Sequence, residues 1–149
     1  MVDGALDGAA LIAAARAAAV HAHAPYSRLA VGAAVLLTDG SVVTGANVEN
    51  ASYGLSLCAE TVAIATAASQ GRLRDVVAIG VVGGPMDGVG DQPVRPCGRC
   101  RQVLNEAAQL GRRDLPVFCA GLTGDALEEH RLSRLLPDAF GPADLGLAS

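Results

Sequence analysis

Three cysteines and one glutamate have the types and the spacing needed to build a catalytic metal site. Glu60 follows Cys58 by two positions, and Cys97 and Cys100 stand three residues apart. Side chains at positions i and i+3 leave the same face of a helix, so the two later sulfurs can reach one ion. Catalytic zinc is held by three protein ligands and keeps one position open. The pattern therefore predicts a zinc ion held by Cys58, Cys97 and Cys100.

Glu60 has the position of a proton carrier because it lies beside a ligand and is not spaced to be one. From the first turn of a helix its side chain can reach back toward the open metal position. A carboxylate there can take a proton from an activated water and hand it on. Helix N-termini carry partial positive charge, which favours thiolate ligands at Cys58 and Cys97. Together these residues form the sequence signature of a zinc-dependent deaminase.

Two other roles for the cysteines explain less of the pattern. A structural zinc site closes its shell with four protein ligands, and the remaining cysteine, Cys119, lies in an apolar run typical of a packed core residue. A redox dithiol would use Cys97 and Cys100 but would leave Cys58 and Glu60 without a role. The open catalytic site accounts for all four residues.

The rest of the chain supplies alternating helices and strands that would position this site. Asp39-Gly40 favours a tight hairpin turn, and residues 125–131 are compatible with a strand or a helix. The alternation predicts an α/β fold with helices on both faces of one sheet. Periodicity and Gly or Pro breaks predict helices over 6–20, 58–69 and 98–109, a helical turn over 133–136, strands over 31–37, 41–45, 76–82 and 115–120, and loops over 47–57 and 83–96.

Length and charge limit the classes of protein to be considered. The 149 residues predict a single domain over 1–149, and a net charge of −4 disfavours binding to a nucleic-acid backbone. No apolar run is long enough to span a membrane. The first four residues lack the basic segment of a secretory signal, and four cysteines without such a signal favour metal chemistry. We expect a soluble, cytoplasmic protein.

Six motifs, in order, resemble those of cytidine deaminases of the small, homotetrameric type. The resemblance implies a three-layer fold with a five-stranded mixed sheet between helices, one zinc ion per chain, and active sites shared between subunits. It also implies deamination of cytidine and 2′-deoxycytidine to the uridines with release of ammonia, in pyrimidine salvage. The motifs are Ala24–Arg28, Val31–Ala34, Asn47–Gly54, Cys58–Glu60, Pro96–Gln102 and Leu135–Leu145.

The same resemblance implies roles for residues outside the metal site. Asn47 and Glu49 would bind the ribose 3′-hydroxyl, and their alternation along an extended segment lets both face one pocket. A neighbouring subunit would contribute Ala51 and Tyr53 near the ribose 5′-hydroxyl. The backbone around Ala59 would face the edge of the pyrimidine.

Two positions depart from the family pattern. The first is Leu29, which stands where an aromatic residue usually stacks on the cytosine. Phe140, which matches the family, would reach the base from another subunit. Loss of a base stack costs about 1–3 kcal/mol, which leaves strict preference for cytidine open. Thr61 replaces an arginine that usually contacts the thiolates. Arg101 is therefore expected to offset the thiolate charge, with Arg99 as a second candidate.

Three alternatives follow from these features. Blasticidin S deaminase, a relative, shares the Pro96–Gln102 run, so a modified cytosine nucleoside is the alternative substrate. A polynucleotide-editing deaminase would need a basic groove, which an acidic chain lacks. A structural zinc module would keep its metal without turnover.

The 83–96 loop is long for the family and leads into the zinc ligands, so it could line the mouth of the pocket.

Overall fold

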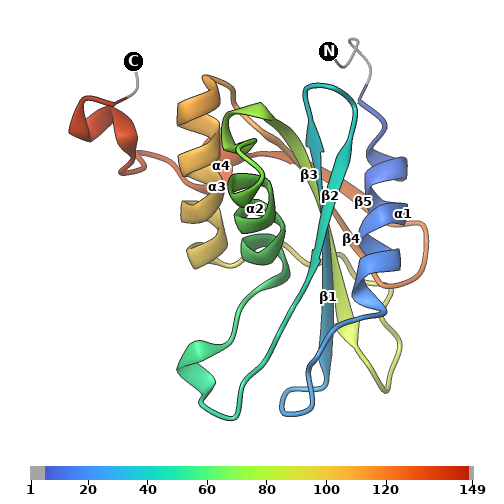
Figure 1. The fold of residues 1–149 in the computed structure, drawn as a ribbon. Coiled ribbons are helices and arrows are strands. Elements are labelled where there is room, and N and C mark those ends of the chain that lie inside the picture. The colour runs from blue at the N-terminus through green and yellow to red at the C-terminus, as the bar shows by residue number, and fades with distance from the viewer. Residues whose placement is uncertain (1–5, 148–149) are drawn as a thin grey trace.

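One mixed sheet of five strands separates α1 from α2 and α3 in the computed structural model, which describes residues 6–147 (Figure 1). The strand order is β2-β1-β3-β4-β5, with β3 and β4 parallel and the other pairs antiparallel. The elements are α1 (Gly8–Ala19), β1 (Leu29–Leu37), β2 (Val42–Ala46), η1 (Tyr53–Leu55), α2 (Ala59–Ser69), η2 (Leu73–Asp75), β3 (Val76–Pro85), α3 (Gly98–Gly111), β4 (Pro116–Gly121), β5 (Leu127–Arg131), α4 (Leu132–Leu135) and η3 (Pro142–Leu145).

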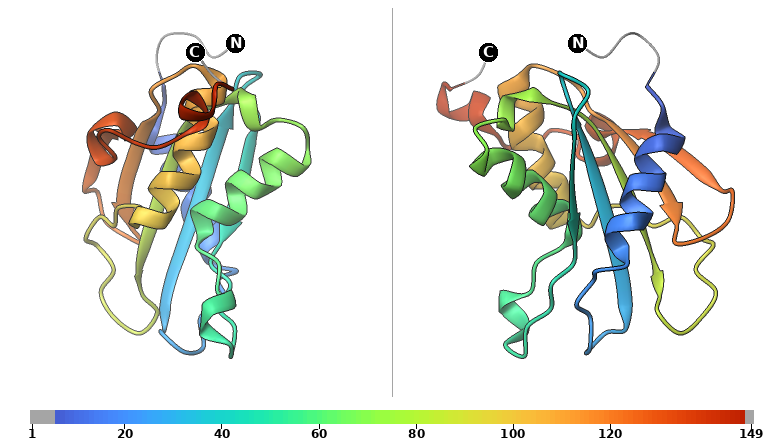
Figure 2. Two further views of the ribbon diagram at one scale, coloured as in Figure 1. Left: turned by 90° about the vertical axis from the view of Figure 1, so that its left-hand side faces the viewer. Right: turned by 45° about the vertical axis from the view of Figure 1, so that its right-hand side comes forward.

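Each face of the sheet has its own apolar core. On one face α1 packs through Leu11 against small residues such as Ala34. On the other face α2 and α3 lie side by side (Figure 2) and pack through Ala63 and Leu104 on strand residues such as Val81. All five side chains are 3% exposed or less, and none is aromatic. With so few bulky residues, the layers can approach each other closely.

Helix α2 approaches the sheet closely at Gly45 in β2. A Cβ atom there would lie 2.6 Å from the carbonyl oxygen of Ala59 and 2.7 Å from the backbone nitrogen of Ala63. Both distances are shorter than van der Waals contact, so only glycine leaves room for the helix backbone. Gly45 therefore sets the height above the sheet of the helix that begins beside Cys58.

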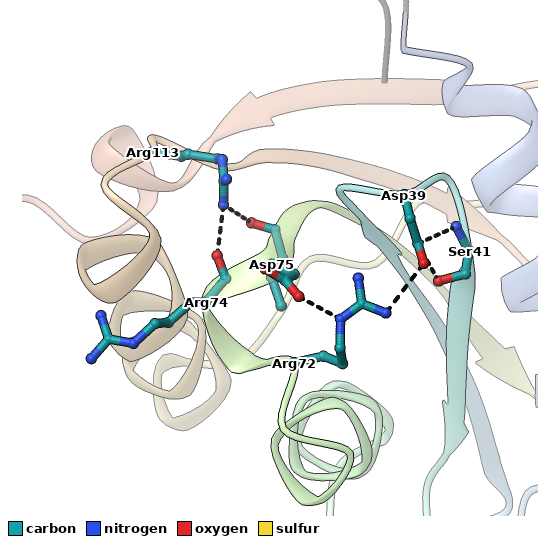
Figure 3. A network of polar contacts seen from close by, with 7 residues as sticks. Asp39, Ser41, Arg72, Arg74, Asp75 and Arg113 are labelled. Carbon is teal, nitrogen blue, oxygen red and sulfur yellow. Dashed lines mark hydrogen bonds and ion pairs between the residues drawn. The ribbon is translucent and has the colours of Figure 1, made fainter. Parts of the chain in front are cut away.

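Polar contacts fasten the far ends of α2 and α3, away from their N-termini (Figure 3). Arg72, which follows α2, donates hydrogen bonds to Asp39 in the β1–β2 turn and to Asp75. Arg113, which follows α3, donates to the carbonyl oxygen of Arg74 at 2.9 Å. These bonds join the hairpin and both helix ends, so the helices are held at the end opposite their first turns.

The structure confirms the predicted fold class and refines several boundaries. Residues 125–131, left open between strand and helix, contain the edge strand β5. The predicted loop over 83–96 begins later than expected, because Gly83 to Pro85 continue β3 and pair with the start of β1. Within the described part of the chain, no helix is long and apolar enough to cross a membrane.

Candidate metal centre and substrate cavity

The three predicted cysteine ligands converge where two helices begin. Cys58 is the N-cap of α2, Cys97 is the N-cap of α3, and Cys100 lies in the first turn of α3. Their sulfurs all lie within 4.8 Å of one another, and the sulfurs of Cys58 and Cys97 are 3.8 Å apart. Zinc–sulfur bonds of about 2.3 Å at tetrahedral angles would place two sulfurs about 3.8 Å apart. The donor set therefore fits zinc in both chemistry and spacing.

Burial and helix geometry affect the three thiols differently. Burial raises the pKa of Cys58 and of Cys100 above the usual value for a thiol, and neighbouring negative groups add to the rise. Burial also acts on Cys97, but the backbone N–H of Cys100 and hydrogen bonds from the other two thiols outweigh it and lower its pKa. Metal ligands must be deprotonated, so metal binding at this site releases protons.

Glu60 occupies the first turn of α2 and lines the same cavity as Cys58 and Cys97. Its side chain is buried, with the residue only 4% exposed. Burial raises the pKa of this carboxyl group, opposed by its own backbone N–H and by a hydrogen bond from Cys100. A carboxyl group with a raised pKa takes up a proton more readily, which suits a proton carrier.

The deepest ligand, Cys100, is fully buried and has a neighbour on the other helix. The hydroxyl oxygen of Thr61 in α2 lies 3.3 Å from its sulfur. Arg101, which is expected to offset the thiolate charge, donates hydrogen bonds from its guanidinium to the carbonyl oxygens of Pro96, at 2.7 Å, and Leu135, at 3.0 Å. Arg101 therefore fixes the backbone that leads into the ligands.

Two further residues considered for the metal region, Arg99 and Cys119, are not members of the three-cysteine cluster. Arg99 is exposed and lines the mouth of the cavity. Cys119 is fully buried in β4, and burial raises its pKa to about 12. A thiol with so high a pKa stays protonated, as expected of a core residue.

A cavity of about 490 Å³ opens above the cysteines. Its volume lies in the range of small-molecule sites. The lining comes from the first turns of α2 and α3, from strands β1 and β3, and from the three loops that precede β1, α2 and α3. The residues are Ser27, Leu29, Val31, Asn47, Glu49, Tyr53, Gly54, Ser56, Leu57, Cys58, Ala59, Glu60, Val81, Val94, Arg95, Cys97 and Arg99.

Asn47 and Glu49 both line this cavity, and hydrogen bonds hold both in place. The amide of Asn47 accepts from the backbone N–H of Val31 and donates to the carbonyl of Leu29, each at 2.9 Å. One carboxylate oxygen of Glu49 accepts from the backbone N–H of Ser27 at 3.1 Å, and the other accepts from the Ser27 hydroxyl. The pKa of Glu49 is lowered, chiefly by that hydroxyl.

The other predicted substrate residues are spread over the surface around the cavity. Leu29 and Ala59 line it, whereas Ala51 is exposed and lies outside the lining. Tyr53 borders the cavity of its own chain and is 73% exposed. Phe140 is 61% exposed and lies outside this cavity.

Some residues of the site were not identified from the sequence as functional. Ser27 lies in the Ala24–Arg28 motif, which was the available signal, but its contact with Glu49 joins positions 22 residues apart. Val94 and Arg95 line the cavity from the loop before α3, as the length of that loop suggested. Arg95 also forms an ion pair with Glu128 of β5 at 2.7 Å.

Known proteins match this chain over most of its length. A family model described as "Cytidine and deoxycytidylate deaminase zinc-binding region" matches residues 7–112. A cytidine deaminase from Halalkalibacterium halodurans is 52% identical over 124 residues, which are 83% of this chain and 86% of that protein. A cytidine deaminase from Mycobacterium tuberculosis is 49% identical over 128 residues, 86% of this chain and 85% of that protein.

Solved structures agree with the sequence matches. The crystal structure of a cytidine deaminase from Burkholderia pseudomallei has a TM-score of 0.78 and 45% identity, and it covers 91% of this chain and all of that chain. The cytidine deaminase structure from Mycobacterium tuberculosis has a TM-score of 0.72 and 43% identity, over 92% of this chain and 99% of that chain. The family-model match spans all three clustered cysteines and Glu60.

Proposed function

This chain belongs to the cytidine deaminase family, and we therefore propose that it hydrolyses cytidine and 2′-deoxycytidine to uridine and 2′-deoxyuridine with release of ammonia. The observation that carries the proposal is the arrangement of three cysteines and one glutamate. Three cysteine sulfurs lie within 4.8 Å of one another, and two of these cysteines, Cys58 and Cys97, line one cavity together with the buried Glu60. The names of the relatives favour cytidine over a modified nucleoside such as blasticidin S.

Cys58, Cys97 and Cys100 would hold one zinc ion, and two of these cysteines, Cys58 and Cys97, line the cavity. When bound, zinc acts as a Lewis acid that makes a water molecule acidic enough to react near neutral pH. The two N-cap positions place the partial positive charge of two helices beside three negative sulfurs. The chain thereby offsets part of the charge that its ligands concentrate there.

Glu60 would move the protons of the reaction. Its carboxylate takes a proton from the attacking water and gives it to N3 of the pyrimidine while the water oxygen adds to C4. Glu60 then carries the remaining hydroxyl proton to the amino group, which leaves as ammonia as the C4 carbonyl forms. The raised pKa of Glu60 suits both steps, because the group must accept and release a proton in turn.

Asn47 and Glu49 would bind the ribose 3′-hydroxyl, Leu29 would line the base pocket, and the backbone at Ala59 would face the pyrimidine edge. Glu49 is held as a carboxylate by Ser27 and keeps lone pairs for a sugar hydroxyl. These roles are supported by the position of all four residues in the lining of one cavity.

The active enzyme would be a homotetramer in which neighbouring subunits contribute Ala51, Tyr53 and Phe140. Large apolar side chains support this assembly, because Tyr53, Phe140 and Leu145 are 73%, 61% and 67% exposed. Contiguous exposed apolar patches mark interfaces, and the proposed assembly would cover these side chains. Gel filtration with light scattering should give four times the mass of one chain, and a fully active monomer would contradict the shared site.

We further propose one domain over 1–149, of which the structure describes 6–147, acting in the cytoplasm in pyrimidine salvage. A reducing compartment is supported by the four cysteines, which are all free thiols. The substrate would be a free nucleoside with no nucleic-acid or membrane partner. The net charge of −4 supports this, because a polynucleotide groove needs clustered positive charge.

The test is a substrate panel with the purified protein and its measured zinc content. Ultraviolet absorbance should fall with cytidine and 2′-deoxycytidine, and elemental analysis should give one zinc per chain. Blasticidin S and a cytosine-containing single-stranded oligonucleotide serve as the two alternative substrates. Turnover of the oligonucleotide, or of blasticidin S in preference to cytidine, would overturn the proposal, as would zinc without turnover of any of the four.

A further inference from the structure

We infer that Thr61 is a positioning residue of the metal site, where its hydroxyl donates a hydrogen bond to the sulfur of Cys100 and slows the loss of zinc. The inference rests on the proposed function only in taking Cys100 as a zinc ligand. Thr61 is not among the residues that line the cavity. Its effect is exerted through one ligand.

The contact joins the two helices that carry the ligands. Thr61 lies in the first turn of α2, and Cys100 lies in the first turn of α3. The hydroxyl oxygen of Thr61 is 3.3 Å from the sulfur of Cys100. Cys100 is fully buried and Thr61 is half-buried, so bulk water does not compete freely for the sulfur. A thiolate can only accept, so in the metal-bound state the hydroxyl must be the donor.

The geometry of Thr61 is not the usual one for a threonine in a helix. Such hydroxyls commonly bond to the carbonyl four residues earlier, and Thr66 on the same helix does so with Val62 at 2.8 Å. The residue four positions before Thr61 is Leu57, which precedes the helix N-cap and pairs with Val48 in an isolated bridge, its carbonyl accepting the backbone N–H of Val48 at 3.0 Å. The Thr61 hydroxyl turns instead to the ligand.

The charge balance of the site gives this bond its importance. Three thiolates and one Zn²⁺ sum to −1, so the sulfurs need hydrogen-bond donors or positive charge nearby. Arg101 directs its guanidinium to the carbonyls of Pro96 and Leu135. Thr61 supplies a neutral donor to the most deeply buried sulfur. Removing a group that hydrogen-bonds to a metal ligand typically costs about 10–100-fold in metal affinity or activity.

The experiment compares zinc release from Thr61→Val, Thr61→Ser and wild type. Valine keeps the shape of threonine and lacks the hydroxyl, whereas serine keeps the hydroxyl. The probe is zinc itself, transferred from the holoenzyme to excess colorimetric chelator and followed with time. We expect Thr61→Val to release zinc about tenfold faster or more, and Thr61→Ser to stay within about threefold of wild type.

Thr66→Val is the matched control. It removes a hydroxyl group from the same helix, but that hydroxyl donates to the carbonyl of Val62 and not to a metal ligand. It should release zinc at the wild-type rate. Equal release from Thr61→Val and Thr66→Val would overturn the inference. If Thr61→Val fails to fold, Thr61→Ser and Thr61→Ala differ by the hydroxyl alone, and equal release from these two overturns it as well. The rate of zinc release is measured without any substrate. A failure of this inference can therefore be distinguished from a failure of the protein to deaminate cytidine.

Discussion

Replacing Gly45 by alanine should lift α2 away from the sheet and displace the catalytic residues with it. The new Cβ would lie 2.6 Å from the carbonyl oxygen of Ala59, where ordinary contact begins near 3.4 Å. The helix backbone must therefore retreat by about 0.8 Å, the difference between these distances, because a backbone carbonyl cannot rotate aside as a side chain can. Cys58, Ala59 and Glu60 all lie at the end of the helix that would move.

Two effects of Gly45→Ala can be given a size. Overpacking of this kind costs about 1–3 kcal/mol of the free energy of unfolding. A displacement near 1 Å of catalytic groups can cost about 10²-fold in rate. We therefore expect kcat/KM for cytidine, corrected for the folded fraction, to fall by about tenfold or more. Zinc should also be lost more readily, because only one of the two ligand-bearing helices moves.

The control for Gly45→Ala is Gly32→Ala on the opposite face of the sheet. Its Cβ would lie 2.0 Å from the carbonyl oxygen of Ala15 in α1, so the loss of stability should be at least as large, while the zinc site stays in place. Urea unfolding, zinc content and initial rates are measured for both variants. If Gly32→Ala does not fold, Gly80→Ala, which meets Leu11 of α1 at 3.0 Å, replaces it. Wild-type rates and zinc content in Gly45→Ala would refute the reasoning.

Three further predictions concern four side chains with proposed or supporting roles in catalysis and substrate binding. Glu60→Gln should keep its zinc and lose about 10²–10⁴-fold in kcat; a loss below about tenfold would mean that the protons move by another route. Ser27→Ala should raise KM about fivefold with little change in kcat, because one hydrogen bond of about 1 kcal/mol orients Glu49; an unchanged KM would contradict this. Phe140→Ala should raise KM by up to the stacking increment of about 1–3 kcal/mol and shift the light-scattering mass downward. Leu29→Phe should lower KM, or raise it if the larger ring overfills the pocket. An unchanged KM in both variants would remove the two residues from the base pocket.

The metal ligands could be identified from the sequence because their chemistry depends on local spacing. Cys58 and Glu60 lie in one helical turn, as do Cys97 and Cys100, and helix periodicity alone places each pair. The placement of helices on both faces of one sheet could also be predicted, because strands that alternate with helices along the chain can pack in only a few layer arrangements. The helix that begins at Ala59 and the tight turn at Gly40, with its φ of 88°, were both predicted.

Contacts between distant segments could not be predicted in the same way. Thr61 was recognised only as a missing positive charge, because its bond to Cys100 depends on how two helices pack. The actual partners of Arg101 are backbone carbonyls, which no residue pattern reports. The continuation of β3 to Pro85 likewise depends on pairing with β1, which supplies partners for a segment rich in glycine.

The meeting of two helix N-termini at one metal site ties the stability of this enzyme to the zinc concentration around it. Zinc would bridge α2 and α3 at one end, while the contacts of Arg72 and Arg113 join them at the other. A ligand that binds only the folded chain stabilises it by RT ln(1 + [L]/Kd), so each tenfold rise in free zinc above Kd adds about 1.4 kcal/mol. A melting temperature for this protein therefore has meaning only with the free zinc concentration stated, and preparations exposed to chelators should melt as two populations.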